Sequence, residues 1–439
     1  MMNAKTVHII GLGGIGTSAI ARYFLSKGAK VSGSDVVLSK IIEDLIKEGV
    51  DFRLGHFVEN VPQECELVVY SRAVSATNPE RQIVSELGIT EFSYPQFLGE
   101  LAKQYKTIAV SGTNGKSTTT AMIASILIEA GFDPTVIVGT QVPCWLGHNF
   151  RAGNSEWFVV EACEHMGSFL SISPDIAVVT NIAEDHLDYY NDLNHIKNTF
   201  AEWLGGIKKG GSCVINSQDK NSLLLSSECK DVFGFENREI VLGGQKFDVS
   251  GDKYQLSIPG EFNASNASAA ITVARKIGIS YEVCASAIAN FKGTWRRFEC
   301  LGSWLDAQVY SDYAHHPDAI KGTINAFIES FPNHRLVIVF EPHQRSRTKE
   351  LFDEFVKSFD GASELILAQI YEVEGRNEGD EVSSLHLTDK IKERGTIGHV
   401  VFAKDYDEIE SILRDRVKKD DIVVFMGAGT IDNLARKLV

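Results

Sequence analysis

The glycine-rich segment at residues 112–118 is the part of the sequence best suited to chemistry. It reads GTNGKST, follows the apolar run Ile108–Val110 and precedes a helix-compatible stretch that reaches Ala130. A strand, a glycine-rich loop and a helix N-terminus together bind nucleotide phosphates, because backbone N–H groups and the helix dipole point at the anion. A lysine would place its charge on the β- and γ-phosphates, and a hydroxyl would hold Mg²⁺. The segment therefore predicts an ATP site built from Gly112, Thr113, Asn114, Gly115, Lys116, Ser117 and Thr118.

A second glycine-rich turn lies near the N-terminus. The string GLGGIG follows the strand-like run Thr6–Ile10 and opens a helix, and a second strand ends at Asp35. This order is typical of a dinucleotide fold, in which the pyrophosphate lies on the helix N-terminus and a carboxylate binds a ribose hydroxyl. Because the glycines recognise only the pyrophosphate, three alternatives stay open: NAD(P), the diphosphate of a UDP-sugar, or a tight turn without a ligand. The candidate residues, at the carboxyl ends of neighbouring strands, are Gly11, Gly13, Gly14, Ile15, Gly16, Asp35, His56, Ser71 and Ser75.

Two further apolar runs should end close to the 112–118 loop. Trp157–Glu161 ends in a carboxylate, and Ile176–Asn181 is followed by Asp185 and His186. Oxygen and imidazole ligands at such a place would suit a metal that bridges ATP and a substrate. The alternative for Glu161 is a helix cap or a surface ion pair.

Polar pairs later in the sequence are also candidates for nucleotide contacts. Asn263 and Asn266 are three residues apart, so they share one face of a helix and could either bind an adenine edge or cap the helix. Arg296 and Arg297 adjoin aromatic residues and could neutralise a γ-phosphate, or be solvated.

The C-terminal part predicts a parallel, doubly wound sheet. Its apolar strands are each followed by an amphipathic helical stretch. The segment Gly427–Thr430 then opens either an anion-binding helix N-terminus or a plain helix. The predicted strands are Leu336–Phe340, Glu364–Ala368, His399–Phe402 and Ile422–Met426.

Composition limits the function classes. The 439 residues suffice for two to four domains, and we expect boundaries at 1–104, 105–302 and 303–439 with a linker at 101–106. With 43 Lys and Arg against 58 Asp and Glu, the net charge of −15 argues against binding to nucleic acid or acidic membranes. Seven cysteines without a CxxC pair indicate reduced, mostly buried thiols in a cytoplasmic protein. No signal peptide or membrane-spanning run is expected.

The motifs in this order resemble the Mur ligases, which are ATP-dependent amide ligases of peptidoglycan precursor synthesis. The resemblance is carried by GTNGKST, Glu161, the Asp185-His186 turn, PGEFNASN, GTWRRFE and DYAHHP. It implies a Rossmann-like N-terminal domain, a central P-loop ATP-binding domain and a doubly wound C-terminal domain. The segments GLGGIGTSAIA, SGSD, SRAVSATNPE and EPHQRSRT are most similar to the members that act on UDP-N-acetylmuramate and L-alanine.

The resemblance implies a reaction and its participants. The lactyl carboxylate of UDP-N-acetylmuramate would be joined to L-alanine through an acyl phosphate, with ATP and Mg²⁺ as cofactors. One alternative is a ligase that recycles the tripeptide L-alanyl-γ-D-glutamyl-diaminopimelate, and a remote one is an NAD(P)-dependent oxidoreductase. The expected partners are these small molecules, without nucleic acid or membrane, in a monomer or weak homodimer.

The resemblance also implies roles for single residues. Ser117 or Thr118 would hold one Mg²⁺, and Glu161 and His186 would bind the second metal. Candidates for the general base are His315, His316 and His343. The remaining implied contacts are adenine for Asn263 and Asn266, the γ-phosphate for Arg297, the nucleotide for Asp312, and the sugar carboxylate and amino acid for His343 and Arg347.

Overall fold

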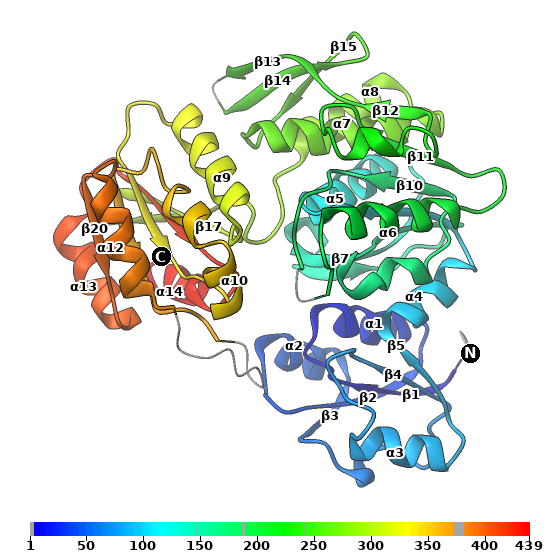
Figure 1. Ribbon diagram of the computed structural model, residues 1–439. Helices are drawn as coiled ribbons and strands as arrows, with labels where there is room; N and C mark the ends of the chain where they lie inside the picture. Colours follow the sequence, from blue (N-terminus) through cyan, green and yellow to red (C-terminus); the bar gives the residue numbers. More distant parts are fainter. Residues whose placement is uncertain (1–3, 146, 187–188, 242, 373–381) are drawn as a thin grey trace. The chain divides into compact units, whose positions relative to one another are not determined.

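The computed structural model describes residues 4–145, 147–186, 189–241, 243–372 and 382–439 (Figure 1). The chain divides into two compact units. Unit 1 contains residues 1–236, 249–252 and 265–289, and unit 2 contains residues 237–248, 253–264 and 290–439. Strands and helices alternate along both units, which confirms the predicted α/β class.

The first sheet of unit 1 is parallel and has the strand order β3-β2-β1-β4-β5. Alternate residues of β1 enter different cores, because side chains of a strand point to opposite faces. Val7 and Ile9 pack with helix α1, whereas Ile10 packs with Val84 of helix α3. Helices α1 and α3 accordingly cover opposite faces (Figure 1). The elements are β1 Thr6–Ile10, α1 Ile15–Ser26, β2 Lys30–Asp35, α2 Lys40–Glu48, β3 Asp51–Leu54, η1 Val58–Asn60, β4 Leu67–Tyr70, α3 Pro79–Glu86, β5 Thr90–Ser93 and α4 Tyr94–Ala102.

The second sheet of unit 1 has the order β12-β11-β10-β6-β9-β7-β8. Its pairs are parallel except for β7 with β8, which is antiparallel. Central strand β6 is flanked by β10 and β9, so the loops that follow these three strands meet at one edge. The elements are β6 Lys106–Ser111, α5 Lys116–Glu129, β7 Thr135–Val142, η2 Pro143–Trp145, β8 His148–Arg151, β9 Trp157–Glu161, η3 His165–Ser171, β10 Ile176–Val179, α6 Leu193–Gly205, β11 Ser212–Asn216, η4 Ser222–Leu225 and β12 Asp231–Phe233.

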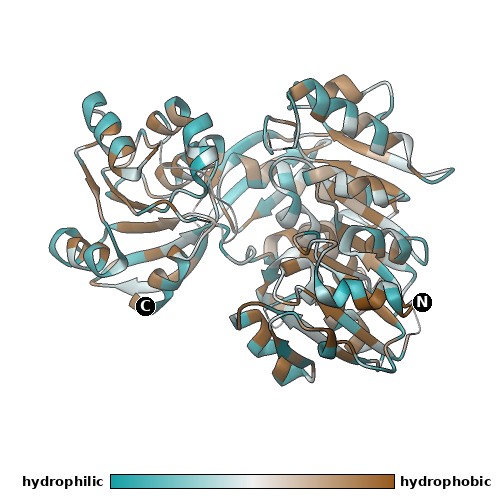
Figure 2. Ribbon diagram, turned by 60° about the horizontal axis from the view of Figure 1, so that its bottom comes forward, coloured by the Kyte–Doolittle hydropathy of each residue, from teal (hydrophilic) through white to brown (hydrophobic). Residues whose placement is uncertain are grey.

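The two sheets of unit 1 share one hydrophobic core. Phe24 of α1 and Phe97 of α4 are fully buried with their ring centroids 5.3 Å apart, and Tyr23 meets Phe150 of β8 edge to face. Figure 2 shows the sheet strands mostly brown, with teal on the helices around them. The predicted linker at 101–106 is wrong at both ends. Leu101 buries its side chain in this core, so α4 continues to Ala102, and Lys106 already begins β6.

Unit 2 contains a sheet with the order β16-β17-β21-β18-β19-β20. The four strands predicted at the C-terminus form parallel pairs within it, and only the β16–β17 pair among its described pairs is antiparallel. The elements are β16 Glu299–Trp304, β17 Ala307–Asp312, α9 Pro317–Ser330, β18 Leu336–Phe340, α10 Arg345–Glu350, α11 Phe352–Val356, β19 Glu364–Leu367, α12 Ser384–Arg394, β20 His399–Phe402, α13 Tyr406–Arg416, β21 Ile422–Met426 and α14 Ile431–Leu438.

A small sheet and two helices complete the chain. The sheet has the order β13-β14-β15. Helix α7 runs through the unit boundary at residues 264 and 265. The elements are β13 Glu236–Val241, β14 Gly244–Val249, β15 Asp252–Leu256, α7 Glu261–Lys276 and α8 Tyr281–Asn290.

The cysteine prediction is wrong in two respects. Cys213 and Cys229 form a disulfide with their Cα atoms 5.3 Å apart, because the chain turns back after β11 and returns beside its start. The free thiols are also not mostly buried, since Cys65 and Cys284 are buried whereas Cys144, Cys163 and Cys300 are exposed. In the described part of the chain, no helix is both long and apolar enough to cross a membrane.

Candidate active site

Residues 112–115 form the loop between β6 and α5, as the sequence predicts, and residues 116–118 begin the helix. Gly115, just before the helix, has φ 86°, a left-handed conformation that favours glycine. A Cβ atom at this position would collide with the amide of Asn266 on α7. The loop can therefore adopt this path only with a glycine at residue 115.

Lys116 folds its ammonium group back over the loop. Its Nζ donates to the carbonyl oxygen of Gly112 at 2.6 Å, to that of Thr113 at 3.1 Å and to Oε1 of Glu164 at 2.9 Å. A lysine ammonium has three hydrogens to donate, so these contacts use all of them. Glu164 follows β9 and was not among the predicted site residues.

The pair of Lys116 and Glu164 is almost wholly removed from water. Their side chains are 13% and 3% exposed. Burial acts to lower the pKa of Lys116, but the carboxylates of Glu164 and Glu161 raise that pKa above its ordinary value. Burial raises the pKa of Glu164, although the charge of Lys116 opposes this. The lysine therefore stays charged, as a phosphate-binding group must be.

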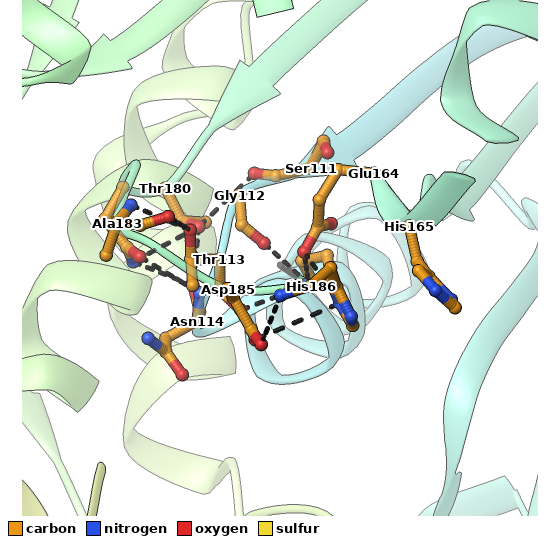
Figure 3. A network of polar contacts seen from close by, with 12 residues as sticks. Ser111, Gly112, Thr113, Asn114, Glu164, His165, Thr180, Ala183, Asp185 and His186 are labelled. Atoms are coloured by element: carbon orange, nitrogen blue, oxygen red, sulfur yellow. Dashed lines mark hydrogen bonds and ion pairs between the residues drawn. The ribbon is translucent and has the colours of Figure 1, made fainter. Parts of the chain in front are cut away.

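The loop that follows β10 clamps the glycine-rich loop. The Asn181 side chain accepts from the backbone N–H of Asn114 at 3.0 Å and donates to its carbonyl oxygen at 2.8 Å. Thr180 Oγ1 also donates to that carbonyl oxygen, and Thr113 Oγ1 accepts from the N–H of Ala183 (Figure 3). These contacts fix the loop without using a ligand, so the phosphate-binding geometry is built into the fold.

His186 lies beside Glu164, at the end of the same clamping loop. Its Nε2 is 3.8 Å from Glu164 Oε1, and its ring stacks on that of His165 with centroids 4.3 Å apart (Figure 3). Its φ of 54° is uncommon for a residue other than glycine. Such backbone strain clusters at functional sites.

Glu161, the other predicted metal ligand, lies at the end of β9. Its Oε2 accepts from the N–H of Gly139 at 2.7 Å. Burial first, and then the nearby charge of Glu161, raises the pKa of Tyr94. Within the described residues, no three His, Cys, Asp or Glu side chains form a group that could hold a metal ion.

The donor set nevertheless fits Mg²⁺. Oε2 of Glu164 is buried and has no hydrogen-bond partner among the described residues, so one carboxylate oxygen near the loop remains available. Ser117 supplies a hydroxyl in the first turn of α5. Mg²⁺ is usually held by one or two carboxylates together with substrate phosphates and water, and an incomplete protein cage is what such a site needs.

The two asparagines of α7 take different places. Asn266 Oδ1 accepts from Thr119 Oγ1 of α5 at 3.2 Å, and Asn263 Nδ2 donates to the carbonyl oxygen of Pro259 at 2.6 Å. Because α7 begins at Glu261, both lie inside the helix and neither is its N-cap.

The N-terminal glycine turn is also preformed. The N–H of Gly13 donates to Oδ2 of Asp35 at 2.8 Å, so the carboxylate predicted to bind a ribose lies against the turn. Gly11 has φ 79°, and a Cβ atom there would stand 2.8 Å from Cβ of Ser71. The structure thus brings the glycine turn, Asp35 and Ser71 together, while Ser75 Oγ bonds to Thr77 Oγ1 in the exposed loop after β4.

His56 belongs to a buried polar network under this turn. Its Nδ1 lies 3.1 Å from Ser34 Oγ and 3.3 Å from Glu80 Oε1, and Glu80 also bonds to His8 on β1. Glu80 is fully buried. Although burial acts to raise its pKa, hydrogen bonds from His8, Ser34 and Asn60 lower it below the ordinary value. Glu80 therefore holds His56 in place.

Contacts within unit 1 link the two loops. A Cβ atom at Gly16 would clash with the ring of Tyr94, so the glycine turn packs against this tyrosine. Burial first, and then the charge of Glu161, raises the pKa of the same tyrosine. Arg72, in the turn after β4, donates to the carbonyl oxygen of Met166 and to Oγ of Ser168, both at 3.0 Å.

In unit 2, Asp312 ends β17 and is buried. Its carboxylate accepts from the N–H groups of Phe298 and Ala314, both at 2.8 Å, and from Thr323 Oγ1. Burial raises its pKa, against the lowering effect of Arg297. The guanidinium of Arg297 lies 4.8 Å from the ring centroid of Tyr313.

The predicted histidines of unit 2 form part of an aromatic cluster. The rings of His315 and His343 are 6.0 Å apart, and the ring of His343 stacks on Tyr371 at 5.5 Å. Arg347 Nη1 lies 3.5 Å from His343 Nδ1. His316 instead caps α9 by accepting from the N–H of Asp318, so it is engaged in the fold.

The segment 427–430 does not offer a free anion site. Oε2 of Glu341 already accepts from the N–H of Ile431 at the start of α14. The guanidinium of Arg296 donates to the carbonyl oxygens of Gly427 and Gly429, so it is buried in the fold and not solvated. The carboxylate of Glu341 therefore occupies the position at the start of α14 that an anion would need.

Three family models match the chain in sequence. They are the Mur ligase family catalytic domain at residues 6–106, the Mur ligase middle domain at 110–274, and the Mur ligase glutamate ligase domain at 296–429.

Matches to known proteins cover nearly the whole chain. The UDP-N-acetylmuramate–L-alanine ligase of Clostridium kluyveri is 39% identical over 97% of this chain and 96% of its own length. That of Caldanaerobacter subterraneus subsp. tengcongensis is 37% identical over 99% and 97%. The crystal structure of the UDP-N-acetylmuramate–alanine ligase of Thermotoga maritima matches with a TM-score of 0.85 at 26% identity, covering 99% of this chain and 98% of that one. A murein peptide ligase of Psychrobacter arcticus shares the fold, with a TM-score of 0.71 at 23% identity over 99% and 98%.

Proposed function

This chain belongs to the Mur ligase family, and we propose that it joins L-alanine to the lactyl carboxylate of UDP-N-acetylmuramate with hydrolysis of ATP to ADP and phosphate. The observation that carries the proposal is the 39% identity to a ligase of that name over 97% of the chain. The charged Lys116, which begins α5 directly after the glycine-rich loop, supports the dependence on ATP. The recycling ligase is not favoured, since the murein peptide ligase of Psychrobacter arcticus is only 23% identical, whereas the relatives with 37% and 39% identity are both named UDP-N-acetylmuramate–L-alanine ligase. The oxidoreductase is not favoured, since none of the relatives described above has that name.

The first step is an electrostatic problem. The lactyl carboxylate must approach the γ-phosphate of ATP to form an acyl phosphate, and both groups are anions. Positive charge that is fixed before the reaction lowers this barrier, because it stabilises the charge that develops during phosphoryl transfer. We assign this task to Lys116 in unit 1 and to Arg297.

Mg²⁺ would supply the remaining positive charge. Ser117, Glu161 and His186 are the residues that we propose to hold it, together with phosphate oxygens of the nucleotide. A metal ion at such a site offsets the repulsion between the anions and orients the phosphates.

The second step needs a neutral amine. L-Alanine attacks the acyl carbon and phosphate leaves, so a base must take a proton from the ammonium form. His315 and His343 are the favoured candidates, since His316 already caps a helix. Arg347, beside His343, would bind a carboxylate of the substrates.

We further propose a division of labour along the chain. Residues 1–104 would bind the UDP group through the glycine turn, Asp35, His56 and Ser71, residues 105–302 would bind ATP, and residues 303–439 would carry the amino-acid site. The three matched segments support this division. Asn263, Asn266 and Asp312 would complete the nucleotide contacts. A cytoplasmic location and a monomeric or weakly dimeric state are part of the proposal, and light scattering tests the latter.

Phosphate release from ATP tests the function directly. The protein is mixed with Mg²⁺, ATP and UDP-N-acetylmuramate, and L-alanine, glycine, L-serine and L-alanyl-γ-D-glutamyl-diaminopimelate are supplied separately. We expect fast release with L-alanine and formation of UDP-N-acetylmuramoyl-L-alanine by mass spectrometry. Release with the tripeptide alone would contradict the proposal and establish the recycling reaction.

A further inference from the structure

Lys116 cannot bind a phosphate as it stands. All three of its ammonium hydrogens are directed at acceptors of this chain, at 2.6, 3.1 and 2.9 Å. Two of these acceptors are carbonyl oxygens of the loop itself, and the third is the carboxylate of Glu164. An arriving phosphate must therefore displace one of them. The carboxylate is the acceptor with which an anionic phosphate competes, because both bind the ammonium through charge.

Glu164 is left in an unusual state by its surroundings. Its side chain is 3% exposed, and its Oε2 has no hydrogen-bond partner among the described residues. A buried carboxylate oxygen without a partner costs free energy whether the group is ionised or not. Protonation would not remove the cost, since the acidic O–H would then need an acceptor. Oε2 of Glu164 gains a partner only when a further hydrogen-bond donor or a cation binds beside it.

The groups around this carboxylate are suited to a cation. His186 Nε2 lies 3.8 Å from Glu164 Oε1, and Glu161 and Asp185 both act electrostatically on the Lys116–Glu164 pair. The backbone of Glu164 is held as well, because the hydroxyl of Tyr190 donates to its carbonyl oxygen at 2.5 Å. Figure 3 shows the carboxylate of Glu164 directed toward Gly112 and His186. The residue is thus fixed in place with one oxygen unused.

We propose that Glu164 serves as a placeholder for the phosphate on Lys116 and, once the nucleotide displaces it, as an additional ligand of the Mg²⁺ that accompanies the nucleotide. The inference rests on the proposed function, since it needs a metal–nucleotide complex at this loop. The exchange conserves charge pairing: the ammonium passes from carboxylate to phosphate, and the carboxylate passes from ammonium to Mg²⁺. Neither charge is left unpaired in the buried site at any stage.

The exchange would couple nucleotide binding to metal binding. Without Mg²⁺, a phosphate that takes Lys116 leaves the carboxylate of Glu164 buried and unpaired, which opposes binding. With Mg²⁺, this penalty disappears. Mg²⁺ therefore raises nucleotide affinity in two ways. It neutralises charge on the phosphates, and it pairs with the carboxylate of Glu164.

Nucleotide binding to Glu164→Gln tests the exchange. Calorimetric titration with ADP is done first in EDTA and then at a series of Mg²⁺ concentrations, and neither titration depends on turnover. We expect E164Q to bind ADP on the order of tenfold more tightly than wild type in EDTA, because a charge-assisted hydrogen bond no longer has to be broken. The Mg²⁺ concentration that gives half of the metal-dependent gain in affinity should rise about tenfold or more, as for a lost metal contact.

A matched control is available at the other end of the same sheet. Asp175 accepts from Lys208 Nζ at 2.8 Å and from the N–H of Thr107 at 2.7 Å, so D175N removes a carboxylate from a lysine pair of the same unit. It should change neither titration. Glu164→Asp keeps the charge and should retain the Mg²⁺ dependence better than E164Q.

The outcomes separate the two hypotheses. Opposite shifts in EDTA and in Mg²⁺, seen in E164Q and absent in D175N, support the exchange. If wild type binds ADP with Mg²⁺ but E164Q lacks either shift, the exchange is wrong and the proposed function stands. If folded wild type binds no ADP under any condition, the proposed function itself fails.

Discussion

Replacing Lys116 by methionine should weaken folding and nearly abolish catalysis for two different reasons. The change keeps the apolar stem but removes three hydrogen bonds and the counterion of Glu164. Removal of one partner from a buried ion pair costs about 3–5 kcal/mol. Because the Lys116 side chain is still 13% exposed, we expect the lower end, about 3 kcal/mol, after allowing for solvent screening.

Protonation of Glu164 sets an upper limit to that loss. At pH 7, protonating a carboxyl with an ordinary pKa of about 4.3 costs about 4 kcal/mol, at about 1.4 kcal/mol per pH unit. Burial already raises the folded-state pKa of Glu164 in wild type, and loss of Lys116 raises it further. The stability deficit of the variant relative to wild type therefore grows as pH rises from the wild-type folded pKa toward that of the variant. The deficit should therefore be at most about 1 kcal/mol at pH 5 and about 3 kcal/mol at pH 7.

Urea unfolding followed by tryptophan fluorescence at both pH values measures this deficit. The double variant K116M/E164Q serves as the control, since it contains no unpaired charge and should recover most of the stability at pH 7. Both variants should release phosphate about 10²–10³ times more slowly than wild type, the typical cost of losing one preorganised charge. Equal stability of K116M and wild type at pH 7, or no recovery in the double variant, would refute the buried pair. Wild-type phosphate release by K116M would refute the role of Lys116.

Three further outcomes are expected. Gly115→Ala should weaken ADP binding at least tenfold in a calorimetric titration, because φ 86° costs a non-glycine residue about 1–2 kcal/mol and the new Cβ would overlap Asn266. Glu80→Gln should lower stability at pH 7 by about 1.5–3 kcal/mol, the value of a hydrogen bond to a charged group. Since the folded-state pKa of Glu80 is lowered, its contribution is present above the unfolded pKa of about 4.3 and is lost as pH falls through the folded value, so wild type and E80Q should converge in acid urea titrations. Removal of divalent cations by EDTA should stop phosphate release, and added Mg²⁺ should restore it; release that persists in EDTA would exclude the metal from the reaction.

The sequence predicts those parts of the fold whose signals are local. An apolar strand before each glycine-rich loop and a helix after it predict both loops. Continuous apolar runs predict the strands of the C-terminal sheet. The structure places β1 and β21 at the predicted residues, and β6 extends beyond the predicted run Ile108–Val110 to Lys106–Ser111. Asp35 could be assigned to the first loop because the spacing between glycine turn and acidic residue is a property of one βαβ unit.

The contacts that escaped prediction join distant residues. Glu164 is 48 positions from Lys116, and only the pairing of β9 beside β6 brings them together. The one signal in the sequence was a second acid three residues after Glu161. Glu80 is 72 positions from His8, and Cys213 and Cys229 are joined by a turn that no spacing rule describes. Tertiary packing also extended α4 into the predicted linker, because Leu101 has a core to enter.

The core shared by the two sheets of unit 1 limits where the chain can be divided to make chimeric enzymes. A cut between residues 104 and 105 follows the expected domain boundary, yet it separates Tyr23 from Phe150 and strips Phe24 and Phe97 of the second sheet that shares their core. Exposed aromatic surface of this kind promotes aggregation. A fragment that ends at residue 104 should therefore be insoluble when expressed alone. A chimera that takes the first sheet from a relative should therefore take both sheets of unit 1 as one block.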